Sequence, residues 1–205
     1  MLKPSIHNKV LPLWNSLRIP SSSMLGQQSR YLLWQWLKTS LQLPGDVVEF
    51  GVWKGGSALI MAECLKSNSS PKKLLLLDSF EGMPDPDPVK DNHWKSGDLA
   101  VSVDEVTTLL SKYEGVCILK GPFEETMHQL PESISFVHID CDLYSSVMLA
   151  TEGCYSRLSR GGAIIYDDYA WADCRGAKMA VDEFYADKAE KPVHLLTSQA
   201  VVIKQ

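Results

Sequence analysis

The sequence predicts an α/β protein built on a doubly wound, mostly parallel sheet that ends in an antiparallel hairpin. Three observations predict this fold. Short apolar runs alternate along the chain with segments whose apolar residues recur at helical spacing. Polar or glycine-containing turns separate these segments. Two apolar runs near the C-terminus follow each other with no helix between them, as in a hairpin.

Residues 1–23 contain Pro4, Pro12 and Pro20 and predict an irregular arm, whereas residues 24–205 predict one domain of ordinary composition. Apolar residues recur between residues 24 and 43 and indicate a helix that Pro44-Gly45 ends. A short apolar strand follows at residues 47–50.

Residues 57–65 place Ala58, Met61 and Leu65 at helical spacing. Residues 73–77 are apolar after their first lysine, which is typical of a strand covered on both faces. The same reasoning gives the remaining elements in order: helix 103–112, strand 116–119, short helix 124–129, strand 134–139, helix 144–158, a turn at Gly161-Gly162, strand 163–166, helix 176–185, and strands 194–196 and 200–203.

Composition excludes several classes of protein. Twenty basic and 25 acidic residues give a net charge of −5 with no basic stripe, so we expect no nucleic-acid partner. No apolar stretch is long enough for a membrane span or a signal peptide, so we expect a cytoplasmic protein without a membrane partner. The five cysteines form no CxxC pair, which argues against a zinc ribbon and favours reduced thiols.

The first strand runs into a glycine-rich turn, which favours a bound nucleoside. Gly51, Val52, Trp53 and Ser57 lie where a parallel sheet binds ligands, beyond the carboxyl end of a strand. The turn lacks both the Gly-x-Gly-x-x-Gly and the Gly-Lys-Ser/Thr patterns, so an ordinary strand-to-helix turn stays an alternative.

Asp78-Ser79 follows the next strand, and Asp78 lies 27 positions after Gly51. A carboxylate in this place suits the two hydroxyls of a ribose. The alternative is that Asp78 caps a turn.

The acidic residues after two later strands carry the strongest signal. Asp140 and Asp142 follow one strand, and Asp167 and Asp168 follow the next. If the first of these strands continues through Asp142, then residues 140 and 142 project on the same side. Like charges gathered at one sheet edge repel and raise one another's pKa unless a cation is present, and carboxylate oxygens suit Mg²⁺ before Ca²⁺. The alternatives are that Asp142 N-caps the helix at 144–158 and that Asp168 caps a turn.

Three further features are less specific. His138 lies on an apolar strand, where it is either a hydrogen-bonded core residue or a group that orients an aspartate or takes a proton. The polar segment 81–99 predicts a lid or substrate loop, and Trp53, Trp94 and Trp171 flank the same edge. The apolar stretch 31–37 suggests a homo-oligomer.

Taken together, these segments resemble the macrocin O-methyltransferase (TylF-type) family. The resemblance rests on five stretches: 45–57 (GDVVEFGVWKGGS), 78–82 (DSFEG), 138–144 (HIDCDLY), 166–169 (YDDY) and 174–177 (CRGA). It implies a Rossmann-like class I methyltransferase fold and Mg²⁺-dependent methylation, by S-adenosyl-L-methionine, of a small-molecule hydroxyl, typically on a sugar of a natural product. A vicinal diol would allow a second acceptor oxygen to chelate the same ion.

The resemblance also implies roles for individual residues. Asp140, Asp167 and Asp168 are similar to the metal ligands, and Asp142 to the general base, with Asp140 and His138 also counted as catalytic. The cofactor pocket is expected to comprise Glu49, Gly51, Val52, Trp53, Ser57, Asp78, Ser79, Gly121, Phe123 and Asp140. The segment before Met24 is short relative to many members of the family. A metal-assisted hydrolase and a non-catalytic nucleoside-binding module are the alternatives that the residues leave open.

Overall fold

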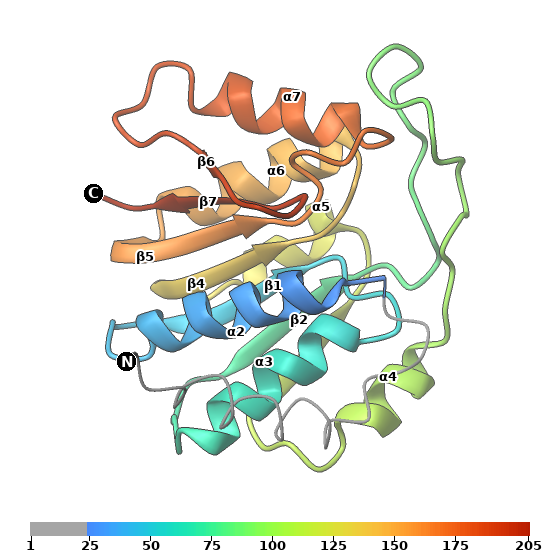
Figure 1. Cartoon of the computed structure of the whole chain (residues 1–205). Helices are drawn as coiled ribbons and strands as arrows, with labels where there is room; N and C mark the ends of the chain where they lie inside the picture. The colour runs from blue at the N-terminus through green and yellow to red at the C-terminus, as the bar shows by residue number, and fades with distance from the viewer. Residues whose placement is uncertain (1–23) are drawn as a thin grey trace, which may run out of the picture.

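The computed structural model describes residues 24–205, so the arm expected over residues 1–23 lies outside the described part. A central sheet separates two layers of helices (Figure 1). Its strand order is β3-β2-β1-β4-β5-β7-β6. The first five strands are mutually parallel, and β7 runs antiparallel to both β5 and β6. The doubly wound sheet and its C-terminal hairpin are therefore confirmed.

The elements have the following bounds. The strands are β1 (Asp46–Phe50), β2 (Leu74–Asp78), β3 (Val116–Lys120), β4 (Ile134–Ile139), β5 (Leu158–Tyr166), β6 (Val193–His194) and β7 (Ala200–Ile203). The helices are α2 (Gln27–Ser40), α3 (Gly56–Ser67), α4 (Val103–Leu110), α5 (Phe123–Thr126), the 3-10 turn η1 (Met127–Gln129), α6 (Tyr144–Tyr155) and α7 (Arg175–Phe184).

The order of the strands places a crevice in the middle of the sheet. From β1 the chain moves outward through β2 to the edge strand β3, and then returns to the other side of β1 as β4. Ligands of such sheets bind beyond the carboxyl ends of the strands at this reversal. The loops after β1 and β4 are therefore the expected walls of a binding site.

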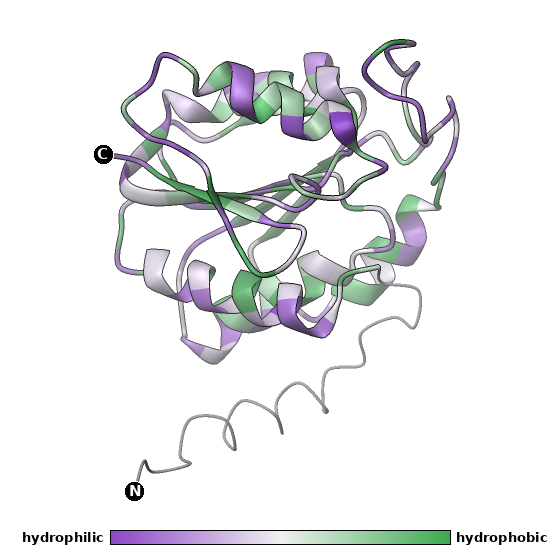
Figure 2. Cartoon of the chain, turned by 45° about the horizontal axis from the view of Figure 1, so that its top comes forward, coloured by the Kyte–Doolittle hydropathy of each residue, from purple (hydrophilic) through white to green (hydrophobic). Residues whose placement is uncertain are grey.

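Successive side chains of each strand point to opposite faces of the sheet, so each face has its own hydrophobic core. Val47 and Leu74 face the core shared with α2, α3 and α4, whereas Val48 and Leu75 face the core shared with α6 and α7. The strands are largely hydrophobic, and the long loop between β2 and α4 is largely hydrophilic (Figure 2). In α2, Leu33 and Leu37 are completely buried while Tyr31 remains exposed, so the homo-oligomer stays a prediction.

Two predicted boundaries are wrong. The helix expected to reach residue 158 ends at Tyr155, and β5 begins at Leu158 because this residue pairs with Ile134 of β4. The glycine pair expected as a turn lies within β5, where the register with β4 is interrupted and Gly161 has φ +81°. The glycines thus form a bulge inside a strand.

The hairpin also differs slightly, because β6 comprises Val193–His194 instead of residues 194–196. Leu196 lies in the connection to β7 and is fully exposed. Among residues 24–205, no helix is long and apolar enough to cross a membrane.

Candidate active site

The site lies at the carboxyl ends of β1, β4 and β5, and its shape depends on one glycine. Gly51 follows β1 with φ +80°, and a Cβ at this position would lie 1.8 Å from the carbonyl oxygen of Asp140. Only glycine therefore lets the β1–α3 turn approach the turn after β4 so closely. The glycine-rich turn is both a strand-to-helix connection and one wall of the site.

Two adjoining cavities open beside this turn. The larger has a volume of about 650 Å³, within the range of small-molecule sites, and the smaller about 60 Å³. The residues that line both cavities are Gly51, Trp53, Leu99, Asp140 and Asp142. The two aspartates therefore stand at the junction of the cavities.

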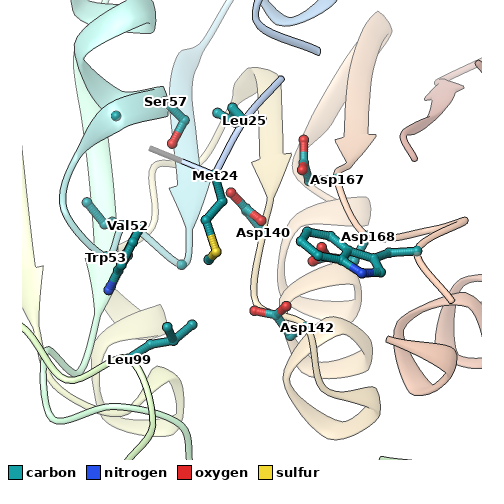
Figure 3. A pocket seen from close by; sticks show the side chains of 13 residues that line it. Met24, Leu25, Val52, Trp53, Ser57, Leu99, Asp140, Asp142, Asp167 and Asp168 are labelled. Carbon is teal, nitrogen blue, oxygen red and sulfur yellow. The ribbon is translucent and has the colours of Figure 1, made fainter. Parts of the chain in front are cut away.

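Three carboxylates converge on the smaller cavity, as the sequence predicts. Asp140, Asp167 and Asp168 each contribute an oxygen to a group whose atoms all lie within 4.8 Å of one another (Figure 3). Oδ2 of Asp168 is buried without a hydrogen-bond partner among the described residues. Burial, followed by the neighbouring carboxylates, raises the pKa of Asp168 well above its ordinary value, and burial and Asp167 do the same for the pKa of Asp140. Three oxygen ligands and an unsatisfied carboxylate fit a hard divalent cation.

Asp142 lines the same cavities as Asp140, but the backbone that places it there differs from the one expected. Because β4 ends at Ile139, the pleat of a strand does not align Asp142 with Asp140. A turn does so instead, with Asp142 at φ +57°. Oδ1 of Asp142 accepts hydrogen bonds from Nε1 of Trp94 (3.0 Å) and from the thiol of Cys174 (3.2 Å).

The interpretation of Asp142 as the N-cap of α6 is wrong. Leu143 occupies the N-cap position without a side-chain hydrogen bond. The backbone N–H of Tyr144 donates instead to Oδ1 of Asp91, at 3.0 Å. The carboxylate of Asp142 is thus free of a capping role and faces the cavities.

His138 and Glu49 lie behind the cavities and line neither of them. Both are completely buried, and Nδ1 of His138 lies 2.9 Å from Oε1 of Glu49. Nε2 of His138 lies 3.5 Å from Oδ1 of Asp167. Burial lowers the pKa of His138, but Asp167 and Glu49 outweigh it and raise this pKa to about 10. His138 thus contacts a candidate metal ligand from behind, and its catalytic role stays a prediction, as does cofactor binding by Glu49.

Asp78 has the turn-capping role considered for it, and its expected contact with a ribose stays a prediction. Its Oδ2 accepts the backbone N–H groups of Val52 (2.7 Å) and Trp53 (2.9 Å), and its Oδ1 accepts that of Phe80 (2.7 Å). The carboxylate therefore organises the turn after β1, and it also lines the larger cavity.

The other expected cofactor residues divide between the two cavities. Ser79, Gly121 and Phe123 line the larger cavity with Asp78. Val52 and Ser57 line the smaller one. Apart from the buried Glu49, the residues of the expected pocket therefore line one or both of these adjoining cavities.

The loop 81–99 covers part of this site. Its residues Met83, Pro84, Ser96 and Leu99 line the larger cavity. Of the three tryptophans expected at this edge, Trp53 and Trp171 line the smaller cavity, whereas Trp94 binds Asp142. Whether the loop moves as a lid stays a prediction.

Sequence reasoning missed three residues that support the acidic cluster. Cys174 donates to Asp142, Asp91 anchors the loop, and Gln199 donates to Oδ1 of Asp167 at 2.6 Å. No local pattern marks Gln199 or Asp91. The CRGA stretch contained Cys174 but did not indicate its partner.

The fold and the site together define the architecture of a class I O-methyltransferase. The solved structure of the O-methyltransferase NovP matches with a TM-score of 0.79 and 28% sequence identity, over 89% of this chain and 82% of that one. The family model of macrocin-O-methyltransferase (TylF) matches residues 20–205, and the chain belongs to this family.

Two curated relatives come from Streptomyces. The 8-demethyl-8-(2,3-dimethoxy-alpha-L-rhamnosyl)-tetracenomycin-C 4'-O-methyltransferase of Streptomyces olivaceus is 36% identical over 148 residues, which are 66% of this chain and 57% of the relative. The demethyldecarbamoylnovobiocin O-methyltransferase of Streptomyces niveus is 34% identical over 157 residues, 70% of this chain and 59% of the relative. The chain thus spans less than two thirds of the length of these two proteins.

Proposed function

We propose that the protein transfers a methyl group from S-adenosyl-L-methionine to a hydroxyl of a small molecule, on the sugar of a natural product, with Mg²⁺ as a second cofactor. The family and the names of the two Streptomyces relatives support methyl transfer to such a molecule. The observation that carries the proposal is the convergence of three carboxylates beside the junction of two cavities.

In this proposal the larger cavity holds S-adenosylmethionine. Its volume suits a nucleoside, and it combines the carboxylate of Asp78 with the aromatic ring of Phe123. Asp78 would accept hydrogen bonds from the ribose hydroxyls through lone pairs that the backbone N–H groups leave free. Gly121 and Phe123 would lie beside the adenine.

The smaller cavity would hold the cation and the acceptor hydroxyl. Asp140, Asp167 and Asp168 supply the ligands, and the unpartnered Oδ2 of Asp168 is an observation that a cation would explain. A divalent cation supplies Lewis acidity, which makes a hydroxyl easier to deprotonate. A vicinal diol or a glycosylated acceptor would present two oxygens to the site and gain a fixed orientation.

Methyl transfer is an in-line displacement, in which an O–C bond forms as the S–C bond breaks and the hydroxyl loses a proton. Asp142 stands at the junction of the cavities, and both of its hydrogen bonds fall on Oδ1. Oδ2 is therefore the oxygen that would take the proton. Trp53 and Leu99, which line both cavities, would exclude water from the sulfonium.

We propose further that loop 81–99 acts as a lid, and we retain the cytoplasmic location and the homo-oligomer as proposals. The contacts of Asp91 and Trp94 with the α6 region support a loop that closes on the site. The apolar stretch of α2, with Tyr31 left exposed, supports the oligomer.

The test is calorimetric titration with S-adenosylmethionine, followed by mass spectrometry of glycosylated and catechol acceptors with Mg²⁺ or with chelator. We expect cofactor binding, and a product heavier by one methyl group that forms only with the divalent cation. Hydrolysis of an acceptor without S-adenosylmethionine would favour the hydrolase. Cofactor binding that no cation or acceptor converts into turnover would favour the nucleoside-binding module.

A further inference from the structure

Gln199 reaches the acidic cluster from the C-terminal hairpin. Ala200, the first residue of β7, pairs with Tyr166, the last residue of β5. Gln199 therefore lies beside Asp167 at the end of the sheet where the cavities open. Its side chain is completely buried.

The contacts of the amide fix its orientation. Nε2 donates to Oδ1 of Asp167 at 2.6 Å and to the carbonyl oxygen of Ser29 at 3.5 Å. Oε1 accepts from the hydroxyl of Thr197 at 3.3 Å. A flipped amide would direct its oxygen at two other oxygens, so only this orientation satisfies all three partners.

Two nitrogens thus lie beside the same oxygen of Asp167, and Gln199 is the one that donates a hydrogen bond to it. Nε2 of His138, a residue of β4, lies 3.5 Å from Oδ1 of Asp167. Nε2 of Gln199, a residue of the hairpin, lies 2.6 Å from the same oxygen. Oδ2 is left for another partner. The amide of Gln199 carries no charge, so it fixes the orientation of the carboxylate without adding the positive charge that a lysine would bring. A carboxylate that is held in one orientation is what a cation site requires.

We propose that Gln199 is a positioning residue of the cation site, which turns Asp167 so that its Oδ2 faces Asp140 and Asp168. This inference rests on the cation of the proposed function. It also assigns the C-terminal hairpin a role in positioning a metal ligand, in addition to completing the sheet. Groups that hydrogen-bond a metal ligand typically change metal affinity by about 10- to 100-fold when they are replaced.

The test titrates Gln199→Met and the wild-type protein with Mn²⁺ in the absence of acceptor. Electron paramagnetic resonance monitors the binding of Mn²⁺. Methionine keeps the volume of the side chain and removes its donor. We expect the Kd for Mn²⁺ to rise by about 10-fold or more, while the Kd for S-adenosylhomocysteine changes by less than about twofold, within ordinary measurement scatter.

Two further variants keep the inference testable if Gln199→Met folds poorly. Thr197→Val removes the hydroxyl that orients the amide and lies nearer the surface, so we expect a smaller loss of Mn²⁺ affinity in the same direction. Ser135→Ala is the control, because it removes a partly buried hydrogen bond to the carbonyl oxygen of Asp46, at the opposite end of the strands. We expect it to leave Mn²⁺ binding unchanged.

The outcomes separate the two proposals. Equal Mn²⁺ affinity in wild type, Gln199→Met and Thr197→Val would overturn the role of Gln199 and leave the cation site intact. A wild-type protein that binds neither Mn²⁺ nor Mg²⁺ would overturn the cation of the proposed function together with this inference. An equal loss in Ser135→Ala would show a general effect of stability and would also overturn the inference.

Discussion

Nε1 of Trp94 lies 3.0 Å from Oδ1 of Asp142 and joins loop 81–99 to the candidate general base. The ring of His93 stacks edge-on against Trp94, with centroids 4.5 Å apart. Three residues earlier, the buried Asp91 accepts the first N–H of α6. The loop is therefore attached at two points to the segment that carries Asp142, so its position and the orientation of the carboxylate are coupled.

Trp94→Phe removes the indole N–H and keeps an aromatic ring at this position. One of the two donors that hold Asp142 is then lost, and we expect kcat to fall about 10-fold, because a hydrogen bond to a charged group is worth about 1.5–3 kcal/mol. KM for S-adenosylmethionine should change little. Trp36→Phe on α2 is the matched control, and an unchanged kcat in Trp94→Phe would contradict the coupling.

Asp142→Asn separates a base from a metal ligand. An amide cannot accept the proton, so we expect kcat to fall by about 10²- to 10⁴-fold, the usual contribution of general base catalysis. Asp142 is not among the three proposed ligands, so Mn²⁺ affinity should stay close to that of wild type. Steady-state kinetics and Mn²⁺ titration on the same preparation measure both values. Turnover that survives the exchange would assign the base elsewhere.

Gly176→Ala tests the anchor of the loop. A Cβ at Gly176, in the first turn of α7, would lie 1.8 Å from Oδ1 of Asp91, so the loop and the cap of α6 must shift. Overpacking of this kind costs about 1–3 kcal/mol, which is about 2–12 °C in Tm for a chain of this size. In Gly26→Ala the added Cβ meets only a side-chain oxygen of Gln28 at 4.0 Å, so its Tm should change little. Equal Tm values for the two variants would contradict the anchor.

The lowered pKa of Glu190 predicts that the free energy of unfolding depends on pH. Burial acts to raise its pKa, but hydrogen bonds from the backbone of Gln205 and from Tyr155, together with Lys204, lower it to about 2 from an ordinary 4.5. A lowered pKa stabilises the fold above about pH 4.5, and this contribution is lost as the pH falls towards 2.

Urea unfolding of wild type and Glu190→Gln between pH 6 and pH 2.5 checks this expectation. The difference in the free energy of unfolding should be largest near pH 6 and should shrink below about pH 4.5. Glu132→Gln, an exposed exchange, measures the effect of an ordinary surface substitution. A difference for Glu190→Gln that stays constant over the whole range would contradict the assigned contacts.

The acidic cluster could be predicted because its members are marked locally. Asp140, Asp167 and Asp168 each follow an apolar run, and the carboxyl ends of neighbouring parallel strands meet at one edge of a sheet. The same logic placed Gly51 and Asp78 beside a shared cavity. These predictions needed only the order of the elements and the direction of the strands.

The supporting contacts could not be predicted, because the partners are distant in sequence. Gln199 contacts Asp167 across 32 positions and Ser29 across 170, and Trp94 contacts Asp142 across 48. No periodicity encodes such pairs. The boundary at Leu158 failed for a related reason, since its apolar side chain also fits the preceding helix until pairing with Ile134 assigns it to β5.

The most direct test of the account is turnover of S-adenosylmethionine by Asp167→Asn, measured against Mg²⁺ concentration. Asp104→Asn, an exposed exchange on α4, is the control. We predict that Asp167→Asn loses Mg²⁺-dependent turnover while calorimetry still finds the cofactor bound with nearly wild-type affinity. Mg²⁺-dependent methylation at the wild-type rate in this variant would contradict the claim that the carboxylates form one cation site.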